Sequence, residues 1–126
     1  YGDTSKPPAA SGYLWTLDLR ARTFSSPVIH DDVLYIGAGE KLVAVELQNQ
    51  KIIWEKSAGG VLYSTPAVTG GRVYAGGENG HLYVFDANTG EQLQDLTIGG
   101  EIKTVPAIYG SSIYLSSGDG NLYKVN

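Results

Sequence analysis

The chain has no cysteine, no methionine and only two histidines. Without cysteine it cannot form a disulfide scaffold, a cysteine-ligated zinc site, an iron–sulfur cluster or a thiol nucleophile. His30 and His81 have no second histidine at metal-ligand spacing, so we expect no metal site. A run of about 18 apolar residues is also missing, and no transmembrane helix is predicted.

Charge is sparse as well, because only 17% of the residues are charged, nine of them basic and thirteen acidic. The net charge of -4 and the lack of a basic run argue against a nucleic-acid partner. With 42% hydrophobic residues over 126 positions, the composition predicts one folded domain. Absence of methionine and the start at Tyr1 favour an exported, processed chain; a piece of a longer chain is the alternative.

Glycine and tyrosine are abundant, with seventeen and nine residues, and no long stretch has helical periodicity. This composition indicates an all-β chain of short strands and tight turns. Three residue types recur 39 or 40 residues apart, which indicates an internal repeat. The recurring sets are Pro27, Pro66 and Pro106; Tyr35, Tyr74 and Tyr114; and Leu42, Leu82 and Leu122.

Each period predicts short apolar strands separated by tight turns. In the first copy these strands are residues 24–29, 33–36 and 42–45, and the third strand is followed by a fourth. Four short strands in about 40 residues are typical of a β-propeller blade. Apolar residues at consecutive positions fit sheets that are covered on both faces. The sequence therefore predicts an all-β fold of three blades, each of four antiparallel strands.

Residues 82–90 read Leu-Tyr-Val-Phe-Asp-Ala-Asn-Thr-Gly, and Ser-Ser-Pro or Ser-Thr-Pro opens the first two repeats. These residues resemble the repeat of the quinoprotein-like (PQQ-like) β-propeller family, over residues 13–126. The resemblance implies that Trp15 and Trp54, 39 residues apart, dock between adjacent blades, whereas Gln94 departs from this pattern. Enzymes of the family that these residues resemble hold pyrroloquinoline quinone against calcium, typically beneath a vicinal disulfide. Without cysteine or an oxygen-ligand cluster outside turns, we expect no cofactor, no metal and no catalytic residues here.

The number of predicted strands in the last blade leads to a prediction about assembly. Tyr13–Leu19 matches the fourth-strand type, and we expect this segment to complete the last blade, which otherwise has three strands. Residues 1–12 form an extended leader, and residues 13–126 form the three-blade unit. Since known propellers have at least four blades, exposed sheet faces at both ends should need a partner. Two copies could close a six-bladed ring by exchanging Tyr13–Leu19, or exchange could form a filament; loss of blades from a longer parent is a third alternative.

Five residues are candidates for contact with a ligand or partner. Arg20 and Arg22 replace Gly59 and Val61 of the next repeat, and the simplest explanation is that they are solvated loop charges. The other three candidates occupy one equivalent position at the start of the innermost strand, and they could equally pack the turn. They are Phe24, Tyr63 and Lys103.

The sequence thus favours a non-catalytic, extracytoplasmic propeller module that self-associates and acts as a scaffold for protein interactions. Its partners would be further copies of itself, through Tyr13–Leu19, and other extracytoplasmic proteins or glycans. One alternative is a lectin-like module that binds carbohydrate or another small ligand through Trp, Tyr and Asn side chains. Another is a fragment of a larger quinoprotein-like enzyme or of a sensor domain.

Overall fold

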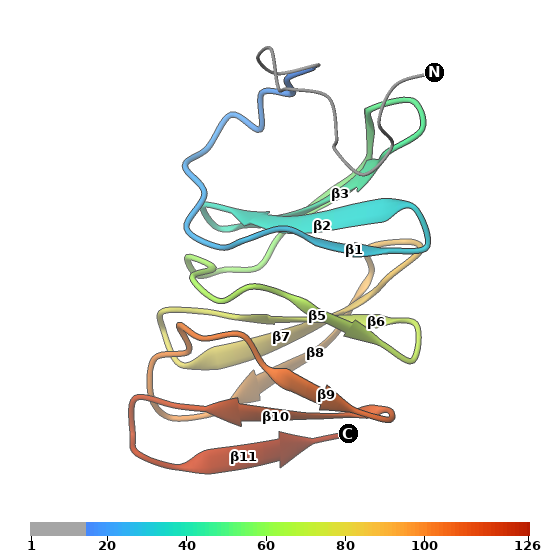
Figure 1. Cartoon of the computed structure of the whole chain (residues 1–126). Coiled ribbons are helices and arrows are strands. Elements are labelled where there is room, and N and C mark those ends of the chain that lie inside the picture. The colour runs from blue at the N-terminus through green and yellow to red at the C-terminus, as the bar shows by residue number, and fades with distance from the viewer. Residues whose placement is uncertain (1–14) are drawn as a thin grey trace, which may run out of the picture.

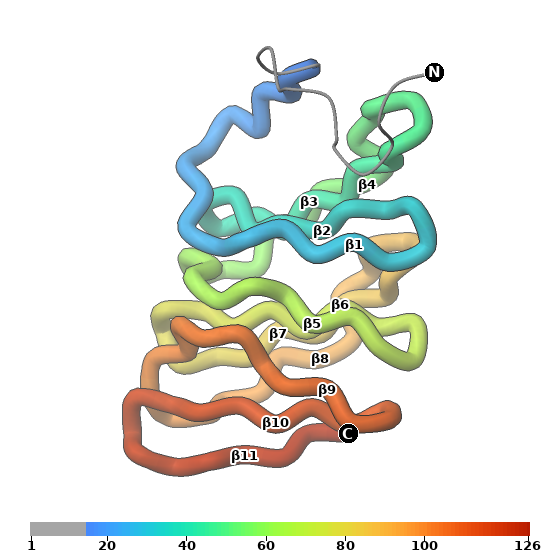
Figure 2. The backbone as a smooth tube through the Cα atoms, viewed as in Figure 1, coloured from blue at the N-terminus to red at the C-terminus, as the bar shows by residue number. Residues whose placement is uncertain are grey.

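The computed structural model describes residues 15–126 as three antiparallel β-sheets stacked one above the next (Figures 1 and 2). Each sheet is a meander whose strands pair in chain order. This arrangement confirms the predicted all-β fold of propeller blades. The first sheet contains β1 (Val28–His30), β2 (Val33–Ala38), β3 (Lys41–Glu46) and β4 (Lys51–Ser57). The second contains β5 (Ala67–Thr69), β6 (Arg72–Gly76), β7 (His81–Asp86) and β8 (Gln92–Thr97). The third contains β9 (Ala107–Tyr109), β10 (Ser112–Ser116) and β11 (Leu122–Val125).

The innermost strands β1, β5 and β9 each begin directly after a proline, at Pro27, Pro66 or Pro106. Proline cannot donate to a sheet ladder, so pairing starts only after it, and β1 begins at Val28 and not at Phe24 as predicted. These strands lie side by side across the three sheets and face the viewer in Figures 1 and 2.

The outer strands carry matching irregularities. The register between β3 and β4 shifts at Ala44/Val45, and that between β7 and β8 shifts at Val84/Phe85. Each shift leaves one extra residue, Ile53 or Leu93, without a direct partner, as in a β-bulge. The bulges explain why these two large apolar side chains are exposed on otherwise buried sheets.

The outer strand predicted for the last blade is the one departure from the expected strand pairing. Tyr13 lies outside the described residues, and residues 15–19 form no strand in the single chain. Instead, Leu17 and Leu19 pack on the outer face of the first sheet, against the buried Val43 and Val45. These residues precede β1 closely along the chain, so the first sheet is within their reach and the third sheet is two blades away.

The apolar core lies between neighbouring sheets, and Trp54 anchors the contact between the first and second. This buried indole donates from Nε1 to the Ala87 carbonyl at 3.1 Å and stacks on Phe85 with ring centroids 6.3 Å apart. The Tyr35 hydroxyl donates to the same carbonyl at 3.1 Å. Both donors come from the first sheet and their acceptor belongs to the second, so the loop after β7 locks the two blades together.

Gly90 closes that loop, in a left-handed conformation with φ of 76°. A Cβ built on it would lie 2.5 Å from the Trp54 ring, closer than any real contact allows. Glycine is therefore required for two reasons: it tolerates the left-handed backbone conformation, and it has no Cβ to collide with the indole ring.

We expect Trp54→Phe to lower the free energy of unfolding by about 2 kcal/mol, because it removes a buried donor and leaves a void. Chemical denaturation followed by circular dichroism measures this change. The matched control is Ile53→Thr on the same strand, where an exposed bulge residue should change stability by less than about 0.5 kcal/mol. Equal effects of the two substitutions would contradict the anchoring role of Trp54.

Gly90→Ala should destabilise the protein by more than Gly110→Ala does. Gly110 has φ of 63° but no atom within 4 Å of a built Cβ, so alanine there meets only backbone strain, about 1 kcal/mol. The excess loss at Gly90, measured by the same denaturation assay, reports the collision with Trp54. If the two alanine variants were equally stable, the close approach of Gly90 and Trp54 would be wrong.

Candidate functional site

Three equivalent residues, Phe24, Tyr63 and Lys103, lie in the segments that lead into β1, β5 and β9. These segments run along the left edge of the molecule in Figures 1 and 2. A backbone hydrogen bond from the β-hairpin of the same blade fixes each segment. The three bonds are Gly39 N–H to Arg22 O at 2.8 Å, Glu78 N–H to Val61 O at 2.8 Å, and Gly118 N–H to Glu101 O at 2.9 Å.

Side-chain hydroxyls hold the same segments from inside. The amide of Gly37 donates to Ser25 Oγ at 3.2 Å, and that of Gly76 donates to Ser64 Oγ at 2.8 Å. A Cβ on Gly76 would lie 2.2 Å from Ile102, so glycine lets the hydroxyl and the neighbouring blade approach closely. These repeated serines serve the architecture, which matches their in-phase spacing in the sequence.

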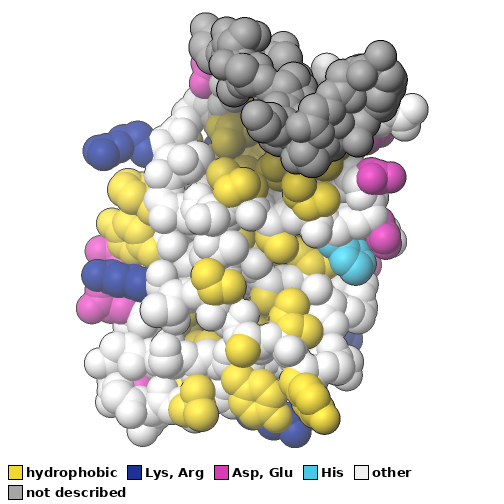
Figure 3. All heavy atoms as spheres, in the orientation of Figure 1, with side chains coloured by type: hydrophobic (Ala, Val, Ile, Leu, Met, Phe, Trp, Pro, Cys, Tyr) yellow, Lys and Arg dark blue, Asp and Glu magenta, His cyan; other side chains and the backbone are white. Residues whose placement is uncertain are grey.

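The fold brings four of the five candidate residues into one continuous stack, which we call the cation–aromatic row: Arg22, Phe24, Tyr63 and Lys103. The rings of Phe24 and Tyr63 meet edge to face with centroids 4.7 Å apart. Arg22 lies 5.5 Å from the Phe24 centroid, and Lys103 Nζ lies 5.7 Å from that of Tyr63. Edge-to-face rings and cations over ring faces are both favourable geometries. Basic, apolar and acidic side chains follow one another along this edge in Figure 3.

Glu101 ends the row with an ion pair to Lys103, 2.9 Å between Oε2 and Nζ. The hydrogen bond and charge of Glu101 raise the pKa of Lys103, so the ammonium keeps its charge. Phe24, which lies next to Arg22 toward the other end of the row, is 44% exposed. Exposed ring surface beside fixed cations suits non-covalent binding, since neither group acts as a nucleophile or base at neutral pH.

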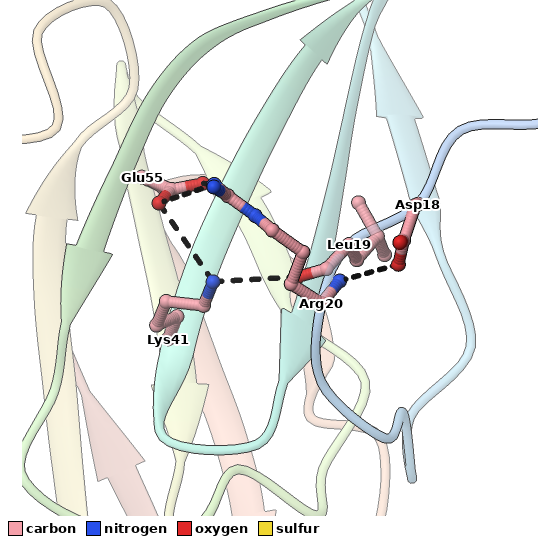
Figure 4. A network of polar contacts seen from close by, with 5 residues as sticks. All are labelled: Asp18, Leu19, Arg20, Lys41 and Glu55. Carbon is pink, nitrogen blue, oxygen red and sulfur yellow. Dashed lines mark hydrogen bonds and ion pairs between the residues drawn. The ribbon is translucent and has the colours of Figure 1, made fainter.

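Arg20 lies elsewhere and has a structural partner. Its guanidinium binds Glu55 of β4 at 3.2 Å, and Lys41 Nζ lies 3.7 Å from the same carboxylate (Figure 4). Lys41 also donates to the Leu19 carbonyl at 3.3 Å, while Asp18 accepts from the Arg20 amide at 2.8 Å. This network ties the segment before β1 to the edge of the first sheet.

Trp15, the second predicted docking tryptophan, is half-exposed and lines an apolar hollow of about 190 Å³. The hollow lies between the N-terminal segment and the outer face of the first sheet, where Leu34, Ile36 and Val45 form its floor.

Two features of the hairpin edge were not predicted from the sequence. Open hollows of about 430 and 290 Å³ separate successive hairpins, and Glu78 and Asn79 line both. The Tyr123 hydroxyl contacts the carboxylate of Asp119 and lies 2.7 Å from the Ile98 carbonyl. The contact with Tyr123 and the Asn121 amide lower the pKa of Asp119, and Asp119 raises the pKa of Tyr123.

His81 is the other missed residue, because its partner is distant in sequence. Its Nδ1 lies 2.6 Å from Asp95 Oδ1 across β7 and β8, and its ring stacks on Tyr83 with centroids 5.9 Å apart. Lys41 and Glu55 form the corresponding pair in the first sheet. The 40-residue period, which makes the two pairs equivalent, is therefore the sequence signal that could have indicated the contact. Within residues 15–126, no three His, Asp or Glu side chains gather as metal ligands. The same part of the chain has no helix long and apolar enough to cross a membrane.

Comparison with known proteins gives relatives of several kinds. A lupanine 17-hydroxylase [cytochrome c] of a Pseudomonas species is 35% identical over 77 residues, 52% of this chain and 11% of that protein. The serine/threonine-protein kinase AfsK of Streptomyces griseus is 37% identical over 67 residues, 48% of this chain and 8% of the kinase. The chain thus spans about a tenth of these relatives.

Solved structures show the same fold at low sequence identity. BamB from Moraxella catarrhalis superposes with a TM-score of 0.72 and 16% identity, over 82% of this chain and 32% of that one. A europium-containing methanol dehydrogenase superposes with a TM-score of 0.75 and 17% identity, over 88% and 24% of the two chains.

A family model described as outer membrane protein assembly factor BamB matches residues 51–126, which is more than half of the chain. The stacked antiparallel meanders, the 40-residue period and this match agree. The chain belongs to the PQQ-like repeat family of β-propellers described by that model.

Proposed function

We propose that this chain is a non-catalytic β-propeller module that self-associates to cover its open sheet faces and acts outside the cytoplasm as a scaffold for protein interactions. The observation that carries the proposal is the outer face of the third sheet. This face has the side-chain pattern of a blade interface and yet is exposed in the single chain.

The pattern follows from the register. Leu42, Leu82 and Leu122 are equivalent, and each lies on the sheet face that points toward the next blade. Leu42 and Leu82 are 0% exposed because a neighbouring sheet covers them, whereas Leu122 is 74% exposed. Tyr74 and Tyr114 are also equivalent, and Tyr74 is buried while Tyr114 is partly open. Hydrophobic side chains accordingly gather at the lower end of the molecule, over β9–β11, in Figure 3.

Tyr109 extends the exposed patch. It pairs with Ser112, which places it on the same face as Tyr114, and it is 78% exposed. Burying a leucine or tyrosine side chain gains about 1.5–3 kcal/mol, and large exposed apolar patches usually mark interaction surfaces. The face is therefore expected to bind another apolar sheet.

The first sheet offers the complementary surface. Its outer face carries Ile29, Leu34, Ile36, Val43 and Val45, which share one side by register. The N-terminal segment covers part of it, and Ile29 remains exposed. Packing this face of one copy on the third sheet of another repeats the contact already present between blades. Two copies would close a ring, and an open succession would form a filament.

The family supports an extracytoplasmic scaffold, because its description names an outer membrane assembly factor. The rival assignment is a segment of a larger quinoprotein-like enzyme or sensor protein, and the hydroxylase and kinase relatives favour it. The two assignments differ in what covers the third sheet: another copy in our proposal, and further blades of the same chain in the rival one.

Size-exclusion chromatography with light scattering tests self-association. We expect a particle of at least two 13.4 kDa chains at micromolar concentration, and Leu122→Asp should shift it to a monomer by placing a charge on the interface. Leu93→Asp is the matched control, since this exposed bulge residue lies on the outer strand β8, and its variant should still associate. A wild-type chain that stays at 13.4 kDa would contradict the proposal.

Binding of a carbohydrate or other small ligand is a second candidate function, which the exposed ring of Phe24 in the cation–aromatic row favours. A glycan array probed with the purified chain should then give hits that Phe24→Ala weakens at least tenfold. Ile53→Thr, which alters an exposed apolar residue of β4, should leave them unchanged. A blank array removes this candidate and does not affect self-association.

A further inference from the structure

The geometry points to a specific mode of self-association: residues Trp15–Asp18 of one copy add as the fourth strand of another copy's third sheet, pairing with β11. This inference rests on the proposed function, and it adds the paired strand and the register to the exchange that the sequence predicts. Two observations on the N-terminal segment and one on the third sheet carry it.

The first observation is a backbone angle. Arg20 has φ of 60°, a left-handed conformation that costs about 1 kcal/mol for a residue other than glycine. Its equivalents in the repeat are Gly59 and Gly99, with φ of 104° and 115°. Those glycines lie just after β4 and β8, where the chain passes from an outer strand to the next blade. Arg20 makes the same turn, so residues 15–18 stand where an outer strand would end.

The second observation is where the side chains of that segment point. Trp15 lines the hollow over Val45 of the first sheet, and Leu17 packs against the same face. Trp54 has the same relation to the second sheet, where it stacks on Phe85, the residue equivalent to Val45. Trp15 and Leu17 therefore already occupy the position of an outer strand in a sheet that adjoins the first sheet.

The third observation is that β11 is an edge strand, at the position where the other two sheets have a fourth strand. Among residues 15–126, the first and second sheets have four strands and the third has three, with β11 at its edge. An edge strand presents unpaired backbone groups that can accept another strand. The outer edges of β3 and β7 are covered by β4 and β8 in one common register, so the register expected on β11 is known.

Transferring that register places Leu17 opposite Leu122, as Leu96 lies opposite Leu82. It places Trp15 opposite Lys124, as Trp54 lies opposite Ala44. Lys124 replaces a small apolar residue, and its Nζ lies 6.0 Å from the Tyr114 ring. An indole beside this ammonium would give it a second aromatic neighbour, so the pairing accounts for a lysine on the face that carries Tyr114 and Leu122.

The ion-pair network of Figure 4 makes the donation compatible with the donor's own fold. Arg20 binds Glu55, and Lys41 binds both Glu55 and the Leu19 carbonyl, so residues 19–20 stay attached to the donor's first sheet. Only residues Trp15–Asp18 need to pair with the other copy. The acceptor's third sheet would then lie against the donor's first sheet.

Disulfide cross-linking tests the register, because the chain has no cysteine of its own. We expect Leu17→Cys combined with Leu122→Cys to yield a covalent species of two chains on oxidation, since directly paired residues have Cα atoms about 4.5–5.5 Å apart. Thr16→Cys with Tyr123→Cys is a second in-register pair on the opposite face and guards against a variant that misfolds. Leu17→Cys with Tyr123→Cys is the matched control, one residue out of register, and should link at least tenfold less.

Mass spectrometry of the unreduced products separates the outcomes. Linked dimers, or a ladder of higher multiples from an open filament, support the strand addition. Association without cross-linking of either in-register pair overturns the inference while the proposed function stands. A link within one chain also overturns it. A chain that does not associate at all contradicts the proposed function itself.

Discussion

The structure depends on one constraint: each sheet carries large apolar side chains on both faces, so each face is stabilised by another apolar surface against it. The middle sheet meets this requirement fully, with Val73 and Phe85 buried on one side and Tyr74 and Leu82 on the other. The first and third sheets meet it on one side only. Association, strand exchange or addition of further blades would each cover the same exposed apolar area.

The contacts between blades combine this non-directional burial with a few directional bonds. Ala87 O accepts from both Trp54 and Tyr35, and Gly90 leaves room for the indole. The hydrogen bonds from β-hairpins and serine hydroxyls repeat from blade to blade. The repeated part of the sequence therefore builds the scaffold, and departures from the repeat mark the positions with another role. Arg20, Lys103 and Lys124 are such departures, each at a position where the other repeats carry a different residue type.

The comparisons divide between a membrane-assembly factor and enzymes, and the cation–aromatic row helps to weigh them. Its groups present charge and ring surface, which are suited to the partner recognition that we propose. The row also crosses three blades, so it exists only when the sheets are stacked in this order. The proposed binding at this edge and the proposed coverage of the end faces involve different residues, so each can be tested without the other.

The repeat period, the all-β class and most strand positions were determined by the sequence alone, because period and local turn chemistry are local properties. In the first blade, the predicted strands 33–36 and 42–45 lie within β2 and β3 and differ from them by at most two residues at an end, whereas the predicted strand 24–29 starts four residues before β1. Tertiary structure decided what local pattern cannot: that Arg22, Phe24, Tyr63 and Lys103 stack while Arg20 binds Glu55, and that His81 pairs with Asp95. It also decided that Leu17 and Leu19 pack on the first sheet, since a segment attached next to β1 covers the nearest open apolar face. These outcomes depend on distances between residues far apart in sequence, which only the stacking of the blades sets.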